Sequence, residues 1–309
     1  MKFRILGLFL CVTIVLSSAC ATKSNPTGPS LSPEGTWSLL GTGVSFSQPS
    51  GVAVDSSGNV YVADCVNNRI VELDSKGVSI NGFNSVSGGS PATLDYPNDL
   101  AVDSAKNLYI ADSANNRMVE LNPGGGTVTI IKAYGGMDLN EPSGADLDSS
   151  MDLYIADFGN SRVLELNPAG GAVTEFSSAS NYPFIGSVAV AVDSSKNVYV
   201  ADELNNRVAE LNPGGETVMV YYSDSVKYFA GPSGVAVDSS KNVYVADTGN
   251  NRIVELNQGG DTLAVFTSAL GENFSQPCRL TVDSSGNIFV PDADNNRVVE
   301  FKPQFRRDE

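Results

Sequence analysis

The 309-residue chain contains no histidine, and it has only 19 lysines and arginines against 35 aspartates and glutamates. Without histidine it cannot build a histidine-ligated zinc site, a Ser-His-Asp triad or the usual general base that titrates near neutrality. Its formal net charge of -16 repels nucleic acid, so we expect no nucleic-acid partner. These absences argue against the commonest hydrolytic mechanisms and against a role in nucleic-acid binding.

An internal repeat dominates the rest of the chain. The stretch PSGVAVDSSKNVYVADTGNNRIVELNQGGDTLAVF at residues 232–266 has five relatives, and a period of this length is typical of solenoids and propellers. Within each copy, turns rich in Asp, Asn, Ser and Gly separate four short apolar or alternating runs, which predict antiparallel strands. We therefore predict an all-β, six-bladed β-propeller with four strands per blade. The shared first Asp of the copies is at Asp55, Asp103, Asp148, Asp193, Asp238 and Asp283.

The two ends of the repeat region have complementary defects. Residues 36–40 have the pattern of a fourth strand without a blade of its own, and the sixth copy has no room for a fourth strand after Phe301. We expect the N-terminal strand to complete the last blade and close the ring, which removes open sheet edges. The predicted propeller spans residues 35–303, and a charged tail follows at 304–309.

Two cysteines lie within the predicted propeller. Cys65 opens the turn between the second and third strands of the first blade, and Cys278 opens the first strand of the sixth. Both positions fall on one rim of neighbouring blades, which permits a disulfide in an oxidising compartment. Two thiols are an equal alternative, because the separation of the two Cα atoms cannot be read from a sequence.

The first residues have the order of a bacterial secretory signal: two basic residues, an apolar run at 5–16, and small residues before Cys20. The apolar run is too short for a transmembrane helix. The sequence Leu-Ser-Ser-Ala-Cys resembles a lipobox, in which the cysteine is lipidated and becomes the mature N-terminus. An ordinary signal peptide with an incidental cysteine is the alternative.

We therefore expect residues 1–19 to be a lipoprotein signal peptide and residues 20–34, rich in Pro, Ser, Thr and Gly, to be a flexible tether. The lipobox resemblance implies a lipid-anchored protein of the bacterial cell envelope that faces the periplasm or the exterior. In a Gram-negative cell it implies the outer membrane, because alanine rather than aspartate follows Cys20. Contact with the membrane is expected through the lipid anchor alone.

Each copy also contains a second Asp and, five residues later, an Arg. The two side chains face each other across the turn between the second and third strands, where an opposite-charge pair contributes roughly 0.2–1 kcal/mol. Because all six copies keep both charges, we interpret the pairs as structural rather than as a ring of metal ligands. The pairs are Asp64 and Arg69, Asp112 and Arg117, Asp157 and Arg162, Asp202 and Arg207, Asp247 and Arg252, and Asp292 and Arg297.

Three charged residues break the repeat on the predicted innermost strand, where most copies have glycine or alanine. Asp99 and Arg279 stand four residues before the first Asp of their copies, and Asp146 stands two residues before it. A buried charge needs a partner or a ligand, so these three residues are our candidate binding site at the pore rim. Drift of a degenerate repeat is the alternative. Aromatic residues of the loops form either a binding rim or part of the core: Phe158, Tyr182, Phe184, Tyr228 and Phe229.

The order of Asp, Asn-Asn-Arg and an apolar pair in these copies resembles the NHL repeat family of β-propellers, over about 265 residues. The resemblance implies the fold more strongly than a function, because one fold hosts many functions. Related six-bladed amidating lyases and streptogramin lyases use histidines, which this chain lacks. Gluconolactonase-like propellers hold a divalent metal by Glu, Asn and Asp near the pore, and Asp99 and Asp146 match part of that set.

Taken together, these features favour a lipid-anchored, non-catalytic binding scaffold that recognises protein, peptide or glycan at a propeller face. We expect a monomer that requires no cofactor. A calcium-dependent, gluconolactonase-like hydrolase is the first alternative, and Ca²⁺ would then bind near the pore. A structural component of the cell envelope is the second.

Overall fold

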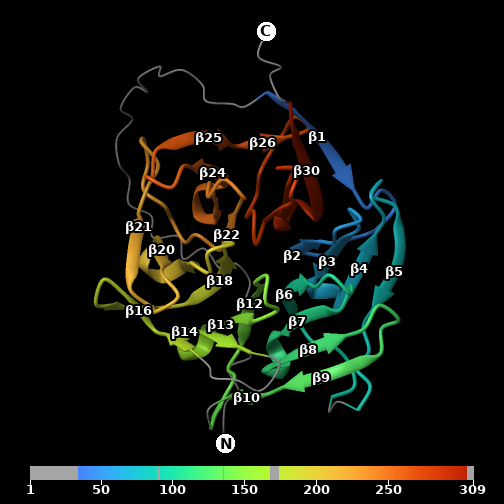
Figure 1. The fold of residues 1–309 in the computed structure, drawn as a ribbon. Coiled ribbons are helices and arrows are strands. Elements are labelled where there is room, and N and C mark those ends of the chain that lie inside the picture. The colour runs from blue at the N-terminus through green and yellow to red at the C-terminus, as the bar shows by residue number, and fades with distance from the viewer. Residues whose placement is uncertain (1–33, 89–90, 135, 168–173, 305–309) are drawn as a thin grey trace, which may run out of the picture.

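The computed structural model describes residues 34–88, 91–134, 136–167 and 174–304. The predicted signal peptide, Cys20, nearly all of the tether and the last five residues of the tail lie outside the described residues. The described chain forms an all-β ring of six blades around a central axis (Figure 1). Each blade is a four-stranded antiparallel sheet, so the prediction of a six-bladed propeller is confirmed. Among the described residues, no helix is long and apolar enough to cross a membrane.

The first three blades each take their four strands consecutively from the chain. From the axis outward, the strands are β2 (Pro49–Val54), β3 (Val60–Asp64), β4 (Arg69–Leu73) and β5 (Ser79–Phe83) in blade 1; β6 (Pro97–Val102), β7 (Leu108–Asp112), β8 (Arg117–Leu121) and β9 (Thr127–Ile131) in blade 2; and β12 (Pro142–Leu147), β13 (Leu153–Asp157), β14 (Arg162–Leu166) and β15 (Thr174–Phe176) in blade 3.

Blades 4 and 5 follow the same plan, whereas blade 6 takes its outermost strand from the N-terminal end of the described chain. The strands are β18 (Ser187–Val192), β19 (Val198–Asp202), β20 (Arg207–Leu211) and β21 (Thr217–Tyr221) in blade 4; β22 (Gly234–Val237), β23 (Val243–Asp247), β24 (Arg252–Leu256) and β25 (Thr262–Phe266) in blade 5; and β28 (Thr281–Val282), β29 (Ile288–Asp292), β30 (Arg297–Pro303) and β1 (Gly35–Leu40) in blade 6.

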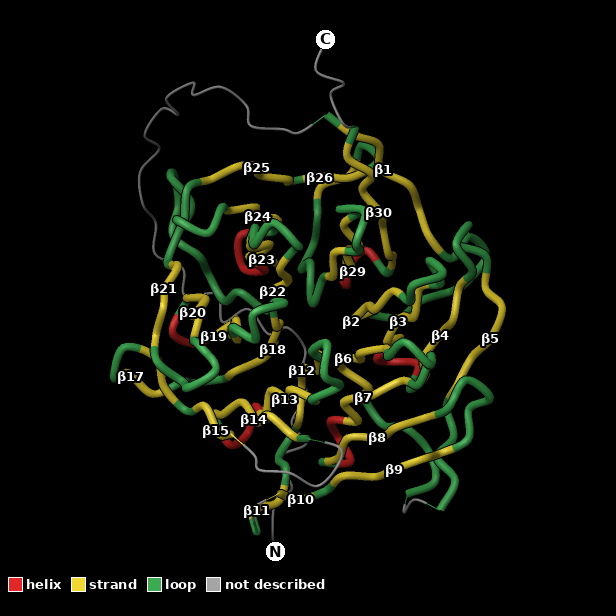
Figure 2. Tube along the Cα trace, viewed as in Figure 1, coloured by secondary structure: helices red, strands yellow, loops and turns green. Residues whose placement is uncertain are grey.

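Three connections between blades form small hairpins at the perimeter of the ring (Figure 2). They follow blades 2, 3 and 5 in the chain. Their strands are β10 (Ala133–Tyr134) and β11 (Met137–Asp138), β16 (Ser178–Ala179) and β17 (Tyr182–Pro183), and β26 (Ser268–Ala269) and β27 (Glu272–Asn273).

A short 3-10 helix joins the second and third strands of every blade, where the sequence predicts a tight turn. Each ends in a left-handed residue with φ between 51° and 54°, which is Ser161 in blade 3 and an asparagine elsewhere. Asparagine suits this position because it tolerates the left-handed conformation. We call the side of the ring that carries these helices the η face. They are η1 (Cys65–Asn67), η2 (Ser113–Asn115), η3 (Phe158–Asn160), η4 (Glu203–Asn205), η5 (Thr248–Asn250) and η6 (Ala293–Asn295).

The N-terminal strand closes the ring as the complementary defects predict. β1 pairs antiparallel with β30, from Gly35 opposite Pro303 to Leu40 opposite Val298. On this strand the Trp37 ring packs against the rings of Phe266, Phe274 and Phe301, with centroid distances of 5.7, 5.5 and 5.0 Å. Closure therefore combines a complete hydrogen-bonded strand with an aromatic cluster between blades 5 and 6.

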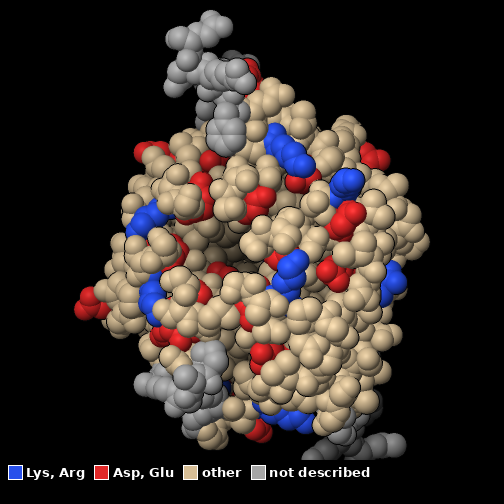
Figure 3. Space-filling view, turned by 45° about the vertical axis from the view of Figure 1, so that its right-hand side comes forward, with Lys and Arg blue, Asp and Glu red and all other residues tan. Residues whose placement is uncertain are grey.

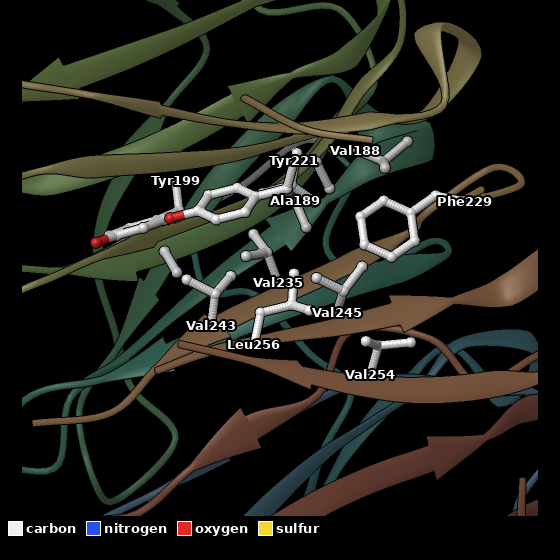
Figure 4. Packing of buried hydrophobic residues seen from close by; sticks show 13 residues of the cluster. Val188, Ala189, Tyr199, Tyr221, Phe229, Val235, Val243, Val245, Val254 and Leu256 are labelled. Carbon is white, nitrogen blue, oxygen red and sulfur yellow. The ribbon is translucent and has the colours of Figure 1, made fainter. Parts of the chain in front are cut away.

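The hydrophobic core lies between neighbouring blades rather than within one sheet. Figure 4 shows the cluster between blades 4 and 5, where the ring of Phe229 from the connecting loop lies beside valines of both sheets. Tyr199 is fully buried there, and Tyr221 of β21 is 3% exposed. The alternating pattern of the repeat places one apolar face of each strand against the next blade, so burial accumulates around the whole ring.

All six repeated Asp and Arg residues form pairs across the turn of the 3-10 helix. The distance from the arginine Nε to the aspartate Oδ2 is 2.6 to 2.8 Å in every blade. The other carboxylate oxygen accepts a backbone N–H from the preceding connection, as from Ser47 to Asp64 at 2.7 Å. The same bond recurs in each of the other blades. The pairs therefore tie the connections on the η face to the strands below them.

Candidate functional site

The innermost strands enclose a cavity of about 230 Å³ on the axis of the ring. Valine and alanine make up most of its wall, which also includes Asp99, Asp146 and Arg279. These are the three charged residues that the sequence singles out, and they come from blades 2, 3 and 6. The space-filling view shows a hollow in the middle of the ring with charged side chains at its edge (Figure 3). The structure thus brings all three candidate residues to one cavity.

Arg279 spans the cavity at the end nearest the η face. Its backbone N–H donates to the carbonyl oxygen of Ser50 in blade 1, at 3.1 Å. Its Nε donates to the carbonyl oxygen of Val188 in blade 4, at 3.1 Å, and its Nη1 donates to Oδ1 of Asn98 in blade 2, at 3.5 Å. One buried side chain therefore links blades 2, 4 and 6 across the axis.

Asp99 and Asp146 each reach from one blade to the inner edge of the next. Asp99 Oδ2 accepts the N–H of Ala145 at 3.2 Å, and Asp146 Oδ2 accepts the N–H of Val192 at 2.8 Å. Burial raises the pKa of both carboxyl groups to about 7, against the opposing effects of these hydrogen bonds and, for Asp99, of the Arg279 charge. Near neutral pH both carboxyl groups are therefore only partly ionised.

Glu203, the first residue of η4, is a fourth charged group at this mouth of the cavity. Burial raises the pKa of its carboxyl group, and the charge of Arg279 opposes the rise. Within the described part of the chain, Arg279 forms no ion pair with Asp99 or Glu203, so it acts on both at longer range. The mouth of the cavity on the η face thus combines one guanidinium with the buried carboxyl group of Asp99 and the partly buried carboxyl group of Glu203.

An apolar patch lies beside this mouth and consists of Phe158, Ile185 and Leu204. The N–H of Leu204 donates to the carbonyl oxygen of Ile185 at 3.2 Å. A Cβ placed on Gly186 would lie 3.1 Å from the Phe158 ring and 3.2 Å from Leu204, so both side chains converge there. Ile185 is 48% exposed and Leu204 is 62% exposed. We call these three residues the blade 3–4 patch.

The patch breaks the symmetry of the ring. Of its three residues, only Phe158 was singled out from the sequence. Comparing loop positions across the six copies could have found the other two. Ile185 corresponds to Ser47, Asp95, Asn140, Ala230 and Ser275, and Leu204 corresponds to Val66, Ala114, Gly159, Gly249 and Asp294. Blade 4 alone combines two large aliphatic residues at these positions.

The loop aromatics divide between the two predicted roles. Phe184 and Phe229 are 2% and 3% exposed and belong to the core between blades. Tyr182 and Tyr228 are 67% and 77% exposed in the connections that precede blades 4 and 5. Phe158 is half-buried and belongs to the blade 3–4 patch. The connections before blades 4 and 5 therefore each expose one tyrosine ring, and the sequence alone could not separate these rings from the buried ones.

The two cysteines are both buried, and no disulfide joins them in the described chain. The Sγ of Cys278 donates to the carbonyl oxygen of Gln276 at 3.3 Å. Cys65 lies near Tyr96 of blade 2, where it adds to the rise in the tyrosine pKa that burial causes. Cys65 thus lies close to blade 2, and the alternative with two thiols describes this structure.

Comparison with known protein families finds the NHL repeat at residues 46–73, 94–121 and 229–256. The chain carries NHL repeats. The three matches cover the inner three strands of blades 1, 2 and 5 together with the last residues of the connection before each. Blades 3, 4 and 6 are not among the matched NHL repeats. A comparison with curated proteins found no significant match to the sequence.

Several solved structures share the propeller fold. A gluconolactonase from Xanthomonas campestris is 13% identical with a TM-score of 0.67, and the match covers 91% of this chain and 99% of that one. A protein of unknown function from Bacteroides thetaiotaomicron is 16% identical with a TM-score of 0.69, and the match covers 88% and 76%.

A catalytically inactive virginiamycin B lyase from Staphylococcus aureus, solved with quinupristin, is a third structural neighbour. It is 14% identical with a TM-score of 0.61, and the match covers 89% of this chain and 90% of the lyase. At such low identities these likenesses show the fold alone, because one fold hosts many functions. What the NHL propeller described here binds must be argued from its own site.

Proposed function

We propose that this NHL propeller is a lipid-anchored, non-catalytic binding scaffold of a bacterial cell envelope. Its working surface is the blade 3–4 patch together with the charged mouth of the cavity. Exposed aliphatic and aromatic side chains next to a guanidinium and two carboxyl groups suit a protein or peptide segment better than a glycan. The Asp and Arg pairs, by contrast, recur in every blade and support the fold.

The observation that carries this proposal is the broken symmetry of the η face. A feature needed for folding recurs in every blade, whereas a binding site requires particular residues at one place. Phe158, Ile185 and Leu204 meet at a single seam between blades, and their counterparts elsewhere are mostly small or polar. Phe158 also packs against the core between blades 4 and 5, but Ile185 and Leu204 are largely exposed, and a partner that covers them would bury apolar surface that the fold leaves in water.

A peptide library tests this binding site directly. We expect the whole protein to select peptides with an apolar anchor residue, and Leu204→Asp to weaken their binding at least about tenfold, about 1.4 kcal/mol. Leu263→Asp is the control, because Leu263 is an exposed aliphatic residue on the outer strand β25. Equal affinity in the wild type and both variants, measured by fluorescence polarisation, would refute the proposed surface.

The lipid anchor is a separate proposal, supported by the order of the N-terminal segment and by Cys20. We expect Cys20→Ala to move the protein from the membrane fraction to the soluble fraction of cells that express it. The wild-type protein should also carry the extra mass of a lipid. A variant that still sediments with membranes, together with a wild type without lipid mass, would show that the cysteine is incidental.

The second candidate is a calcium-dependent lactone hydrolase that uses Asp99 and Asp146. The raised pKa of both carboxyl groups in one cavity favours it, because catalytic carboxyl groups often have raised pKa values. Within the described ranges, however, no three His, Cys, Asp or Glu side chains form a group that could hold a metal. Calcium-dependent hydrolysis of gluconolactone that is lost in Asp99→Asn would favour this candidate.

A protein with neither turnover nor a selected peptide would instead be a structural envelope component.

A further inference from the structure

The repeated arginine of blade 1 differs from its five counterparts in exposure. The Arg69 side chain is 37% exposed, whereas the other five are at most 10% exposed. All six donate Nε to their aspartate, and Arg69 also donates Nη2 to the carbonyl oxygen of Ser45 at 3.1 Å. Its remaining nitrogen, Nη1, has no partner among the described residues. The repeated arginine is therefore buried in five blades and exposed to solvent in blade 1.

In three other blades, Nη1 of the corresponding arginine forms an ion pair with a second carboxylate. Nη1 of Arg252 pairs with Asp224 at 2.5 Å, and Nη1 of Arg297 pairs with Glu272 at 2.8 Å. Both acids come from the connection that precedes the blade. In blade 3, the outer strand supplies Glu175 to Nη1 of its arginine at 3.0 Å. The molecule thus contains three examples of an aspartate, an arginine and a second carboxylate in a row.

The connections make a second recurring contact, with the outer strand of the blade that they precede. The backbone N–H of Ser87, Ser180 or Ser225 donates to a threonine hydroxyl at 2.8, 2.6 or 2.9 Å. These threonines begin the outer strands of blades 2, 4 and 5, as Thr127 does opposite Leu121. Ser79 holds the same position in blade 1, opposite Leu73. Blade 1 therefore also keeps the hydroxyl group that accepts this bond.

Blade 1 lacks the segment that would make both contacts. Its connection, residues 41–48, is two residues shorter than 132–141, 177–186 or 267–276, and the Val44 N–H turns back to the Gly41 carbonyl oxygen at 2.8 Å. The result is an open groove of about 700 Å³ beside β5. Figure 1 shows that β1 ends next to β5 at the outer edge of the ring. The lining of the groove includes Arg69, Ser79, Val44, Val78 and Ile80.

We propose that this groove binds a turn or hairpin of a partner protein that carries an aspartate or glutamate. The carboxylate pairs with Nη1 of Arg69, and a backbone N–H beside it donates to the Ser79 hydroxyl group. An apolar side chain of the same segment packs on Val78 and Ile80, which are each 55% exposed. The net negative charge of the protein does not prevent Arg69 from binding a partner's carboxylate, because the corresponding arginines of blades 5 and 6 each bind a second carboxylate in the same way.

A cyclic peptide that copies residues 268–273, the hairpin before blade 6, tests the groove. We expect the labelled peptide to bind the whole protein with a Kd below about 1 mM, measured by fluorescence polarisation. Changing its glutamate to glutamine should weaken binding at least about tenfold. So should Ile80→Glu, which places a like charge in the groove at an exposed position and leaves the fold intact.

Val128→Glu is the matched control, because Val128 follows Thr127 as Ile80 follows Ser79 and is 53% exposed. This variant should bind the peptide as the wild type does. Absence of binding to the wild type, or equal binding by Ile80→Glu, would overturn the proposal. Self-association of the wild type that Ile80→Glu abolishes, seen by sedimentation, would identify a second copy as the occupant and would overturn the assignment to a separate partner. The peptide-library result at Leu204 is independent of all these outcomes.

Discussion

We expect Trp37→Ala to lower the melting temperature of the protein by about 6–10 °C, through a loss of about 3 kcal/mol in the free energy of unfolding. The indole contacts three phenylalanine rings from both blades that meet at the closing seam. Removing the indole leaves a cavity at the seam where β1, from the N-terminal end of the described chain, pairs with β30 near its C-terminal end. The loss is at the lower end for a tryptophan because the side chain is only half-buried.

Leu39→Ala is the control for closure. Leu39 lies on the same strand, two residues after Trp37, but is 46% exposed. It has the same backbone pairing with β30, so its substitution should change the melting temperature by about 2 °C or less. Similar losses in both variants, measured by circular dichroism or calorimetry, would show that the aromatic cluster does not control closure.

The second large effect concerns the pH dependence of stability. Asp99 and Asp146 have a pKa of about 7 in the folded protein, against an ordinary value of 3.8. Between about pH 4 and pH 7 the folded state therefore holds more protons than the unfolded state. The free energy of unfolding must fall as the pH rises through this window. Asparagine cannot ionise and still accepts the N–H of Ala145 or Val192.

We therefore expect Asp99→Asn and Asp146→Asn to melt higher than the wild type at pH 8 and to lose this advantage near pH 4. Asp74→Asn should behave oppositely and lose stability at high pH, because hydrogen bonds from the N–H groups of Val78 and Lys76 lower the pKa of the Asp74 carboxyl group. Melting curves from pH 4 to pH 8 provide the measurement. Parallel curves for the wild type and both cavity variants would mean that the two carboxyl groups titrate normally.

The fold could be predicted from the sequence because six copies repeat the same physical constraints. The first five copies contain four strand patterns separated by turn residues, the sixth contains three, and the two incomplete ends fit only each other. Closure by β1 follows from that fit, because an unpaired outer strand and an incomplete blade would otherwise remain. The 3-10 helices were not predicted, since a four-residue turn and a single 3-10 turn have the same composition.

The site could be predicted only in part. Asp99, Asp146 and Arg279 stand out by charge against small residues, and their position on the inner strand leads directly to the axis. The partners of Arg279 in blades 2 and 4 could not be predicted, because they depend on how far one side chain reaches across the ring. Glu203 was missed for a similar reason, whereas a comparison of loop positions across the copies could have singled out Leu204. Loop residues follow no strand period, so their exposure depends on the twist of the blades.

Site-specific photo-crosslinking in cells tests the central claim, that one seam of the η face is the working surface. Every blade has an equivalent position at the second residue of its 3-10 helix. A photoreactive amino acid placed at Leu204 can therefore be compared with the same amino acid placed at Val66, Ala114 or Asp294. Gly159 and Gly249 are left out, because a Cβ there would collide with Asn140 or Ala230. We predict a discrete adduct from position 204 and none from the other three. Equal adducts from all four positions, or adducts from position 66 or 294 alone, would contradict the account.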